Sequence, residues 1–501
     1  VNYQHSINFL YKIPVTVRQG TLNGIQSTLP NGAPYYSFKG VPYATPPVGD
    51  LRFENPLDCF KEGNMCLQNN IFKGGIIDGS EDCLYLNIYT PNLNPDKPMS
   101  VMLWIHGGAF TYGNANSDYY LPLYLMQEGI VVVTFTFRSG IFGYLYLPDG
   151  GIRGNFGLQD QLAAFKWIKD NISTFGGDPG NLTLFGVSSG AASTHIHVLS
   201  PESKKYIHKA ILQGGNALVD WCNQKNPLRK SRKLAQLMGC EAKNDKEIGE
   251  FLKNEKDPLK LQNHIYNLST PEELRRDYIW SLKPIVEGNI PKAIITRPLW
   301  DLAMEPNTVE IPLMMGFCNK EGISGLELVE NIDEVDKDVA RMVPLRLNLS
   351  DDDPKCLQIA AEIRQLYFKG RRLTKELKDE LIDLLGDAFY IIAKDFAAEF
   401  HSRYQHKSSL YVYRFSFDAK LNFFKKNHPT IKGASHADDR FYIFQKSFDD
   451  GLLKPGSREE LTVKRMCRMF GNFAKYGWHV LGSIGTIGIH IAPISLICRS
   501  K

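Results

Sequence analysis

The sequence predicts an α/β fold with a mostly parallel central sheet flanked by helices. The continuous apolar run at residues 101–105 is typical of a strand buried on both faces, and the largely apolar residues 182–185 predict a second strand. Between them, apolar residues recur at the spacing of one buried helix face: Leu158, Leu162, Phe165, Ile168 and Ile172. A cluster of turn-forming residues at 176–181 separates that helix from the second strand. This alternation of helices and strands predicts the α/β class.

A G-x-S-x-G pattern follows the second predicted strand, at residues 186–190. The chain must reverse there into a helix, which lifts the Ser188 hydroxyl clear of the sheet edge. Such a turn forces positive φ on the serine, so its neighbours Gly186 and Gly190 must be nearly free of side chain. In a chain with 42 glycines, the pattern alone also fits an ordinary strand–turn–helix joint. In this context, it makes Ser188 a candidate nucleophile.

The first predicted strand leads into His-Gly-Gly-Ala-Phe at residues 106–110. Small residues let the backbone approach a substrate and point N–H groups at an oxyanion, as an acyl-transfer serine requires. A plain exit from a strand would also carry glycines. Both pieces together, in this order and each after an apolar strand, predict an α/β-hydrolase fold.

In that fold, the acid and then the histidine of the triad follow the serine along the chain. Glu321 lies in the loop after another apolar run, 311–317, and His436 lies in the loop 433–439. The chain has 54 acidic residues and 12 histidines that compete for these roles. The residues by themselves therefore leave the assignment of both positions open.

Several motifs resemble those of type-B carboxylesterases, in the cholinesterase/carboxylesterase family. The segments that carry the resemblance are 38–53, 80–87 and 154–161, followed by the G-x-S-x-G turn in the family's order. Residues 190–195 and 433–439 look most like the insect alpha-esterase branch. The resemblance runs from about Val15 to about Gly477 and implies an α/β-hydrolase fold with helical insertions over the active site.

The resemblance also assigns roles to individual residues. It implies a catalytic triad of Ser188, Glu321 and His436, and an oxyanion hole formed by the backbone N–H groups of Gly108, Ala109 and Ser189. It further implies a disulfide between Cys66 and Cys83 and an ion pair of Arg52 with Glu81. The nine cysteines are an odd number, so at least one is unpaired unless a partner chain contributes.

Three positions depart from the family's usual pattern. Val187 and Ser189 replace the glutamate and alanine beside the nucleophile, and Gly214 replaces a serine that helps to orient the acid and base. We expect these changes to affect the catalytic rate more than the type of reaction that is catalysed. Residues 71–79 also lack the tryptophan of cholinesterases, so we do not expect a choline-ester specialist.

The function that the resemblance implies is a serine carboxylesterase working through an acyl-serine intermediate. Its expected substrates are carboxylic esters of xenobiotic, lipid or pheromone/hormone type, with inhibition by organophosphates and no metal or organic cofactor. Two alternatives are a slow esterase that mainly sequesters ligands, motivated by Val187 and Gly214, and a non-catalytic binding member of the fold. The presence of all three triad residues favours the enzyme.

The charge, the histidines and the sequons of the chain limit the partners that we expect. A net charge of +4 is too small to suggest nucleic acid. His195 and His197, two apart on a predicted helix, do not face the same way, so we expect no metal there. Four N-x-S/T sequons do not establish secretion, and the start of this chain carries no apolar leader. A cytoplasmic or secreted location and a monomer or homodimer stay open.

We expect one domain over residues 1–477 and a divergent, apolar C-terminal tail over 478–501. The uncharged part of the tail has about the 20-residue length of a membrane span. Three glycines and Pro493 make it a poor helix, so we favour a divergent end over a membrane anchor. Residues 226–380 look less sheet-like than the rest, with charged helical stretches at 243–257 and 371–385.

Overall fold

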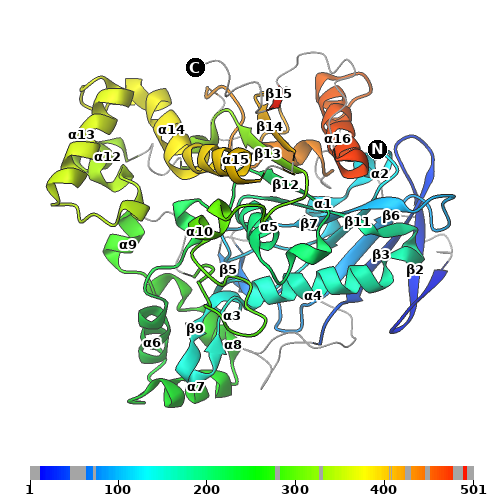
Figure 1. Ribbon diagram of the computed structural model, residues 1–501, viewed down its shortest axis with the longest axis horizontal. Coiled ribbons are helices and arrows are strands. Elements are labelled where there is room, and N and C mark those ends of the chain that lie inside the picture. The colour runs from blue at the N-terminus through cyan, green and yellow to red at the C-terminus, as the bar shows by residue number, and fades with distance from the viewer. Residues whose placement is uncertain are drawn as a thin grey trace.

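An 11-stranded sheet forms the centre of the protein, in the order β1-β2-β3-β6-β8-β7-β11-β12-β13-β14-β15 (Figure 1). The computed structural model describes residues 12–45, 64–70, 75–276, 282–325, 331–405, 407, 409–423, 430–445, 452–477 and 489–493. The strands are β1 (Lys12–Val17), β2 (Gly20–Thr28), β3 (Pro34–Pro42), β4 (Gln68–Asn70), β5 (Ile76–Asp78), β6 (Tyr85–Thr90), β7 (Met99–Ile105), β8 (Val131–Phe135), β9 (Tyr146–Leu147), β10 (Ile152–Arg153), β11 (Gly177–Val187), β12 (Lys209–Gln213), β13 (Leu313–Cys318), β14 (Leu410–Phe415) and β15 (Ile489–Pro493).

Helices cover both faces of this sheet. They are α1 (Ser117–Tyr120), α2 (Leu123–Met126), α3 (Gly140–Tyr144), α4 (Phe156–Asn171), α5 (Ser189–Leu199), α6 (Pro227–Leu237), α7 (Asp245–Asn254), α8 (Pro258–Gln262), α9 (Pro271–Arg276), α10 (Leu299–Met304), α12 (Ile332–Lys337), α13 (Pro354–Phe368), α14 (Lys378–Gly386), α15 (Ile392–Tyr404) and α16 (Arg458–Tyr476).

The middle of the sheet is parallel and its two ends are antiparallel. All neighbouring pairs from β8 through β7, β11, β12 and β13 to β14 are parallel. The predicted strands at 101–105 and 182–185 lie in β7 and β11, and β13 covers the apolar run 311–317 from Leu313 onward. The predicted mostly parallel α/β fold is therefore confirmed.

Strand β7 shows how the alternation of side chains builds two cores. Val101, Leu103 and Ile105 pack in one buried cluster with residues of α4 and α5. Met102 and Trp104 pack in a second cluster with residues of α16. Successive side chains of a strand point to opposite faces, so an entirely apolar strand must be covered on both sides. In Figure 1, α4 and α16 lie on opposite sides of the sheet.

The boundaries of one predicted strand and one predicted helix differ from those in the structure. Strand β11 begins at Gly177, inside the cluster that we expected to precede it, and its pairing with β7 shifts register between Gly177 and Leu182. The stretch 371–385 is helical only from Lys378, after a short 3₁₀ turn at Lys375–Leu377. The N–H of Leu373 instead donates to the Asp336 carboxylate, 2.7 Å away. In both cases, contacts with distant segments override the local sequence pattern, which is turn-forming at 177–181 and helical at 371–377.

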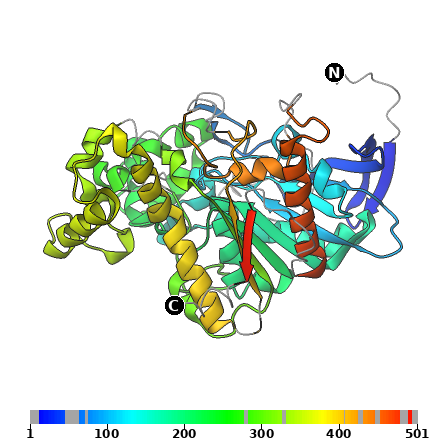
Figure 2. The same ribbon diagram turned by 90° about the horizontal axis from the view of Figure 1, so that it is seen from above.

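The insertion between residues 226 and 380 is mostly helical, as predicted, and β13 is its one strand among the residues described there. Its helices α9, α12 and α13 form a lobe to one side of the sheet (Figures 1 and 2). The predicted charged helix at 243–257 corresponds to α7. Asn244 caps α7 by accepting a hydrogen bond from the Glu247 N–H.

Part of the C-terminal tail adds an edge strand. Residues Ile489–Pro493 form β15, which pairs antiparallel with β14 and is drawn in red in Figure 2. Residues 478–488 and 494–501, which carry most of the tail, lie outside the described residues. Among the helices that are described, none combines the length and apolar character needed to cross a bilayer.

The predicted disulfide between Cys66 and Cys83 is present, and it closes a loop of 17 residues. The predicted ion pair of Glu81 cannot be compared, because Arg52 lies outside the described residues. Replacing Cys66 and Cys83 together by serine should lower the free energy of unfolding by about 3 kcal/mol, because a closed loop restricts the unfolded chain. Urea denaturation measures this change. Cys240→Ser, at a half-buried free cysteine, is the control, and an equal loss there would contradict the assignment.

Candidate active site

Ser188 lies at the junction of β11 and α5, in the strained conformation expected of an elbow. Its φ is 58° and its ψ is −126°. Its N–H donates to the Gln213 carbonyl at 2.8 Å, which fixes the turn against the end of β12. The residue is partly exposed while both of its neighbours are buried. The predicted strand–turn–helix therefore presents the serine at the carboxyl end of the sheet.

The glycines on either side of Ser188 are sterically required. A Cβ on Gly190 would lie 2.1 Å from the Ile105 carbonyl oxygen, and one on Gly186 would lie 2.6 Å from the Gly190 backbone. A side-chain carbon at either position would overlap with backbone atoms that cannot move away. These close contacts support the expectation that both positions must lack a side chain.

His436 and Glu321 are hydrogen-bonded to each other. The His436 Nδ1 is 2.6 Å from the Glu321 Oε2, and both side chains are buried. The other carboxylate oxygen, Oε1, accepts the Cys318 N–H at 2.7 Å. The two loops are also tied together, because the Lys320 N–H donates to the Ala434 carbonyl at 2.9 Å. A carboxylate held in this way fixes the imidazole tautomer with its proton on Nδ1.

A pair of glycines after β12 brings the serine and the histidine to one place. A Cβ on Gly214 would lie 3.0 Å from the His436 Nδ1, and one on Gly215 would lie 2.4 Å from the Ser188 carbonyl oxygen. Ser188 and His436 therefore contact adjacent residues of the same turn. The His436 Nε2 is buried and has no hydrogen-bond partner among the described residues. In enzymes without bound substrate, such a bond to the nucleophile often forms only in the complex.

The loop after β7, where the oxyanion hole is predicted, has three successive residues with positive φ. Gly108, Ala109 and Phe110 have φ of 130°, 55° and 59°. The Gly108 carbonyl is turned back into the loop, where it accepts the N–H groups of Thr111 and Tyr112 at 2.9 and 3.0 Å. Successive residues with positive φ direct neighbouring N–H groups to one side of the chain.

The same loop borders Ser188. A Cβ on Gly107 would lie 3.1 Å from the Ser188 Cβ, so the loop begins in contact with the serine. Ser189 is buried and opens α5, where first-turn N–H groups have no partner within the helix. Val187 packs in the core cluster of α16, so the position where the resemblance predicts a carboxylate is apolar and faces away from solvent.

A buried ion pair, which no sequence motif predicted, lies next to two residues that bind the loop after β7. Arg138 and Asp160 are 2% and 0% exposed, and the Asp160 carboxylate accepts bonds from the Arg138 N–H, Nε and Nη2 at 2.7–3.0 Å. The next two residues bind the loop: the Ser139 hydroxyl donates to the Thr111 carbonyl, and the Gly140 N–H donates to the Phe110 carbonyl. Arg138 follows β8 and Asp160 lies in α4, 22 residues further along the chain, so no local sequence pattern links the two residues.

His106, at the start of the loop, is held as a neutral structural residue. Its ring stacks on Phe137 with centroids 4.1 Å apart, and its Nδ1 is 2.9 Å from the Gly107 carbonyl oxygen. Burial lowers the pKa of His106 to about 4. It is uncharged at neutral pH and serves to shape the loop.

His195 and His197 have protein partners that account for both rings. The His195 Nδ1 accepts the Ala217 N–H at 3.1 Å, and His197 lies between Gln161 and Ser203 at 2.8 and 2.9 Å. Burial lowers the pKa of each histidine to about 3. Both are neutral components of the core below the elbow.

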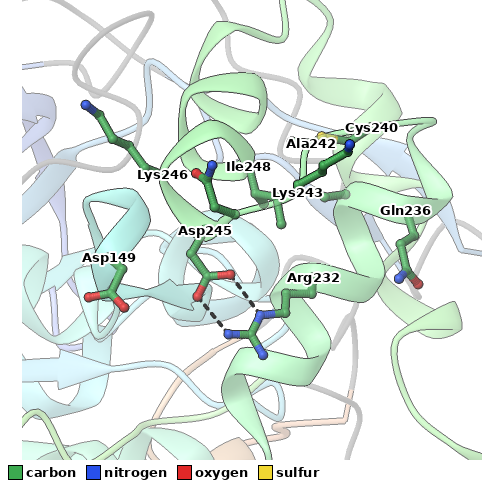
Figure 3. Close-up of a pocket in the computed structure, with 11 residues that line it drawn as sticks. Asp149, Arg232, Gln236, Cys240, Ala242, Lys243, Asp245, Lys246 and Ile248 are labelled. Carbon is green, nitrogen blue, oxygen red and sulfur yellow. Dashed lines mark hydrogen bonds and ion pairs between the residues drawn. The ribbon is translucent and has the colours of Figure 1, made fainter.

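A separate hollow of about 530 Å³ lies between α6 and α7, away from these residues (Figure 3). Polar and apolar groups both line it, and Figure 3 shows the Asp245 carboxylate bonded to the Arg232 guanidinium, with both distances 2.8 Å. Neither Ser188, Glu321 nor His436 lines it. The hollow is an exposed feature of the helical insertion and supplies no group to the chemistry of the serine and histidine.

Substituting Gly214 should separate the acid from the base. A methyl group at this position would lie 3.0 Å from the His436 Nδ1 and 3.2 Å from the Glu321 Oε1, and the residue has φ of 57°. We expect Gly214→Ala to lower kcat by about tenfold or more through displacement of the imidazole. Steady-state kinetics on p-nitrophenyl acetate measure this effect. Gly239→Ala, also at positive φ but with open space around it, is the control for backbone strain. Unchanged kcat in Gly214→Ala would contradict the prediction.

The comparisons with known proteins agree with this geometry. The Carboxylesterase family matches residues 12–480. The chain is 30% identical to Esterase E4 of Myzus persicae, over 92% of this chain and 86% of that protein. It is 31% identical to Acylcarnitine hydrolase of Mus musculus, over 92% and 82%. The crystal structure of juvenile hormone esterase from Manduca sexta, with OTFP covalently attached, superposes with a TM-score of 0.83 at 27% identity, covering 94% and 92% of the two chains.

A mostly parallel sheet with a serine elbow, a positive-φ loop beside it and a buried carboxylate–histidine pair defines an α/β-hydrolase. Because the family match extends over nearly the whole chain, the protein belongs to the carboxylesterase family and is a carboxylic ester hydrolase.

Proposed function

We propose that this chain is a serine carboxylesterase that acts through an acyl-serine intermediate. Ser188 is the nucleophile, His436 the general base and acid, and Glu321 the residue that orients the imidazole. The observation that supports this most directly is the 2.6 Å bond between Glu321 and His436, with the histidine and Ser188 packed on the adjacent glycines 214 and 215.

The proposed reaction uses these three groups in turn. The His436 Nε2 takes the Ser188 proton as the hydroxyl oxygen attacks the ester carbonyl carbon. The imidazolium then gives that proton to the departing alcohol, which leaves the acyl group on Ser188. A water molecule, deprotonated by His436, attacks the acyl-serine, and the acid is released as the serine regains its proton. Glu321 stabilises the positive imidazolium in both halves of the cycle.

The oxyanion that forms in each half requires hydrogen-bond donors. We propose the backbone N–H groups of Gly108, Ala109 and Ser189 for this role. The positive φ of the first two residues, the start of α5 at Ser189 and the contact of Gly107 with the Ser188 Cβ support it.

The substrates that we propose are carboxylic esters of small molecules, of xenobiotic, lipid or hormone type. Relatives named for a juvenile hormone esterase and an acylcarnitine hydrolase support a range of ester alcohols within the family. A phosphorus ester would enter the same cycle and leave a slowly hydrolysed phosphoryl-serine, so we propose inhibition by organophosphates. The covalently attached OTFP of the Manduca sexta enzyme supports a nucleophile in the matching fold.

Stopped-flow kinetics with p-nitrophenyl acetate and butyrate test the proposal. We expect a burst of about one p-nitrophenol per enzyme followed by steady turnover. Incubation with diethyl p-nitrophenyl phosphate should abolish both, and peptide mapping should place the added mass on Ser188. Labelling of another residue, or full turnover by the labelled protein, would overturn the assignment of Ser188.

The second candidate is a slow esterase that mainly sequesters its ligands. Gly214, at the position where the resemblance predicts an orienting serine, is the observation that favours it. A stoichiometric burst with almost no later turnover would support sequestration, because it places the failure in deacylation.

A further inference from the structure

The His436 imidazole is stacked on the phenol ring of Tyr390. The ring centroids are 4.3 Å apart and the planes make an angle of 24°. Tyr390 is buried and belongs to a π-helical turn, Asp387–Ile391, which joins α14 to α15. Turns of this kind are rare and recur at functional sites. No sequence motif pointed to Tyr390.

The single hydrogen bond of His436 leaves one motion of its ring unrestrained. Glu321 holds the Nδ1 edge, whereas the Nε2 edge has no hydrogen-bond partner among the described residues. A ring held at one edge can swing about that bond and carry Nε2 away from the nucleophile. Gly214 has no side chain to limit the swing. A flat ring against the face of the imidazole does limit it.

Tyr390 is itself held firmly enough for this purpose. The Trp221 indole donates to the Phe389 carbonyl at 2.9 Å, and the rings of Trp221 and Tyr390 meet edge to face with centroids 6.1 Å apart. The Tyr390 hydroxyl is 3.4 Å from the Ser324 Oγ, which donates to the Glu321 carbonyl at 2.9 Å. The phenol is therefore linked to the same turn that carries the acid.

The segment that carries Tyr390 also packs against the turn of Glu321. A Cβ on Gly322 would lie 2.0 Å from the Ile382 carbonyl oxygen of α14. A Cβ on Gly386 would lie 3.5 Å from the Glu321 Cβ. The end of α14 thus fixes the acid, and the π-helical turn that follows aims Tyr390 at the base. One continuous helical segment sets the position of both groups.

We propose that Tyr390 is a positioning residue for His436, which keeps the imidazole in one orientation so that its Nε2 stays in line with Ser188. The electron-rich face of the phenol also favours the imidazolium formed in each half of the cycle. This inference rests on the proposed serine mechanism and goes beyond it, because the contact made by Tyr390 is with the base and not with the substrate.

Two substitutions at Tyr390 separate the ring from its hydroxyl. In Tyr390→Leu, kcat should fall about 10- to 100-fold with KM changed less than about threefold, because the reacting groups are misaligned while the substrate contacts remain. Tyr390→Phe keeps the stacked ring and should stay within about threefold of wild type in both constants. Phe389→Leu, an aromatic-to-leucine change in the same turn, controls for loosening of the helix, and circular dichroism checks that all variants are folded.

The His436 Nδ1 proton gives a readout that does not depend on turnover. Its strongly downfield proton NMR resonance should be present in wild type and Tyr390→Phe, and broadened or lost in Tyr390→Leu. His436→Ala assigns the signal. Wild-type kcat or an unchanged resonance in Tyr390→Leu would overturn the inference. An equal loss in Tyr390→Phe or in Phe389→Leu would also overturn it, because the stacked ring would then not be responsible.

Ser188→Ala in the same series separates the role of Tyr390 from the serine mechanism on which it rests. If turnover survives Ser188→Ala, the proposed mechanism fails. If turnover is lost there while Tyr390→Leu behaves as wild type, the mechanism stands and only the role of Tyr390 is refuted.

Discussion

Replacing Ser188 by alanine is expected to lower kcat for ester hydrolysis by about 10⁴- to 10⁶-fold without unfolding the protein. The change removes only the hydroxyl oxygen, while the Ser188 N–H and its bond to the Gln213 carbonyl remain. Without the Ser188 hydroxyl, no acyl-serine can form. Glu321, His436 and the proposed oxyanion hole then have no covalent step to promote. Steady-state hydrolysis of p-nitrophenyl butyrate and burst amplitude measure the loss.

The adjacent residue supplies a matched control. Ser189→Ala removes a buried hydroxyl one position away and restores the residue that the family usually carries, while its backbone N–H stays available to the oxyanion. We expect kcat within about threefold of wild type for this variant. If Ser189→Ala is as inactive as Ser188→Ala, or if Ser188→Ala retains the burst, then the nucleophile has been assigned to the wrong residue.

The second large effect is expected at the buried pair of Arg138 and Asp160. Asp160→Asn removes the charge of a carboxylate that accepts three hydrogen bonds from Arg138, whose side chain is 2% exposed. Breaking a buried ion pair from one side costs about 3–5 kcal/mol, because water does not replace the lost interaction there. We expect a decrease of that size in the free energy of unfolding, measured by urea denaturation. Activity should fall as well, since residues 139 and 140 bind the oxyanion loop.

An exposed ion pair on α4, the helix that carries Asp160, provides the control for the contribution of burial to stability. Asp170→Asn removes the partner of Arg18 at a site where both side chains are 43% exposed or more. Surface pairs are typically worth less than about 1 kcal/mol, so this variant should be nearly neutral. Comparable losses in Asp160→Asn and Asp170→Asn would contradict the prediction, because burial would then add nothing to the contribution of the pair.

The sequence predicted the parts of the site that have strong local requirements. Gly186 and Gly190 could be justified in advance because a serine at a sharp turn admits no neighbouring side chains, and the structure shows the close contacts responsible. The strands also followed from sequence, since a short uninterrupted apolar run such as 101–105 is typical of a strand covered on both faces, and its side chains enter two core clusters.

Other parts of the site depend on contacts between distant segments and leave no local pattern. Tyr390 is one aromatic residue among many, and its stacking on His436 exists only because α14 packs on the turn of Glu321. The start of β11 within a cluster of turn-forming residues likewise depends on pairing with Met99 across the sheet. Glu321 and His436 could be singled out by resemblance, whereas periodicity left many competitors.

The distance along the chain between the reacting groups has a consequence for synthesis. Glu321 and His436 are 115 residues apart in the sequence, and β14 lies between them along the chain. Ser188 comes well before both. A chain growing on the ribosome therefore cannot react with an active-site label until residues beyond His436 have emerged and β13 and β14 have joined the sheet. Domains generally fold as units during translation, so labelling of nascent chains would report completion of the fold and not merely formation of the elbow. Premature termination before His436 should yield no partially active fragment.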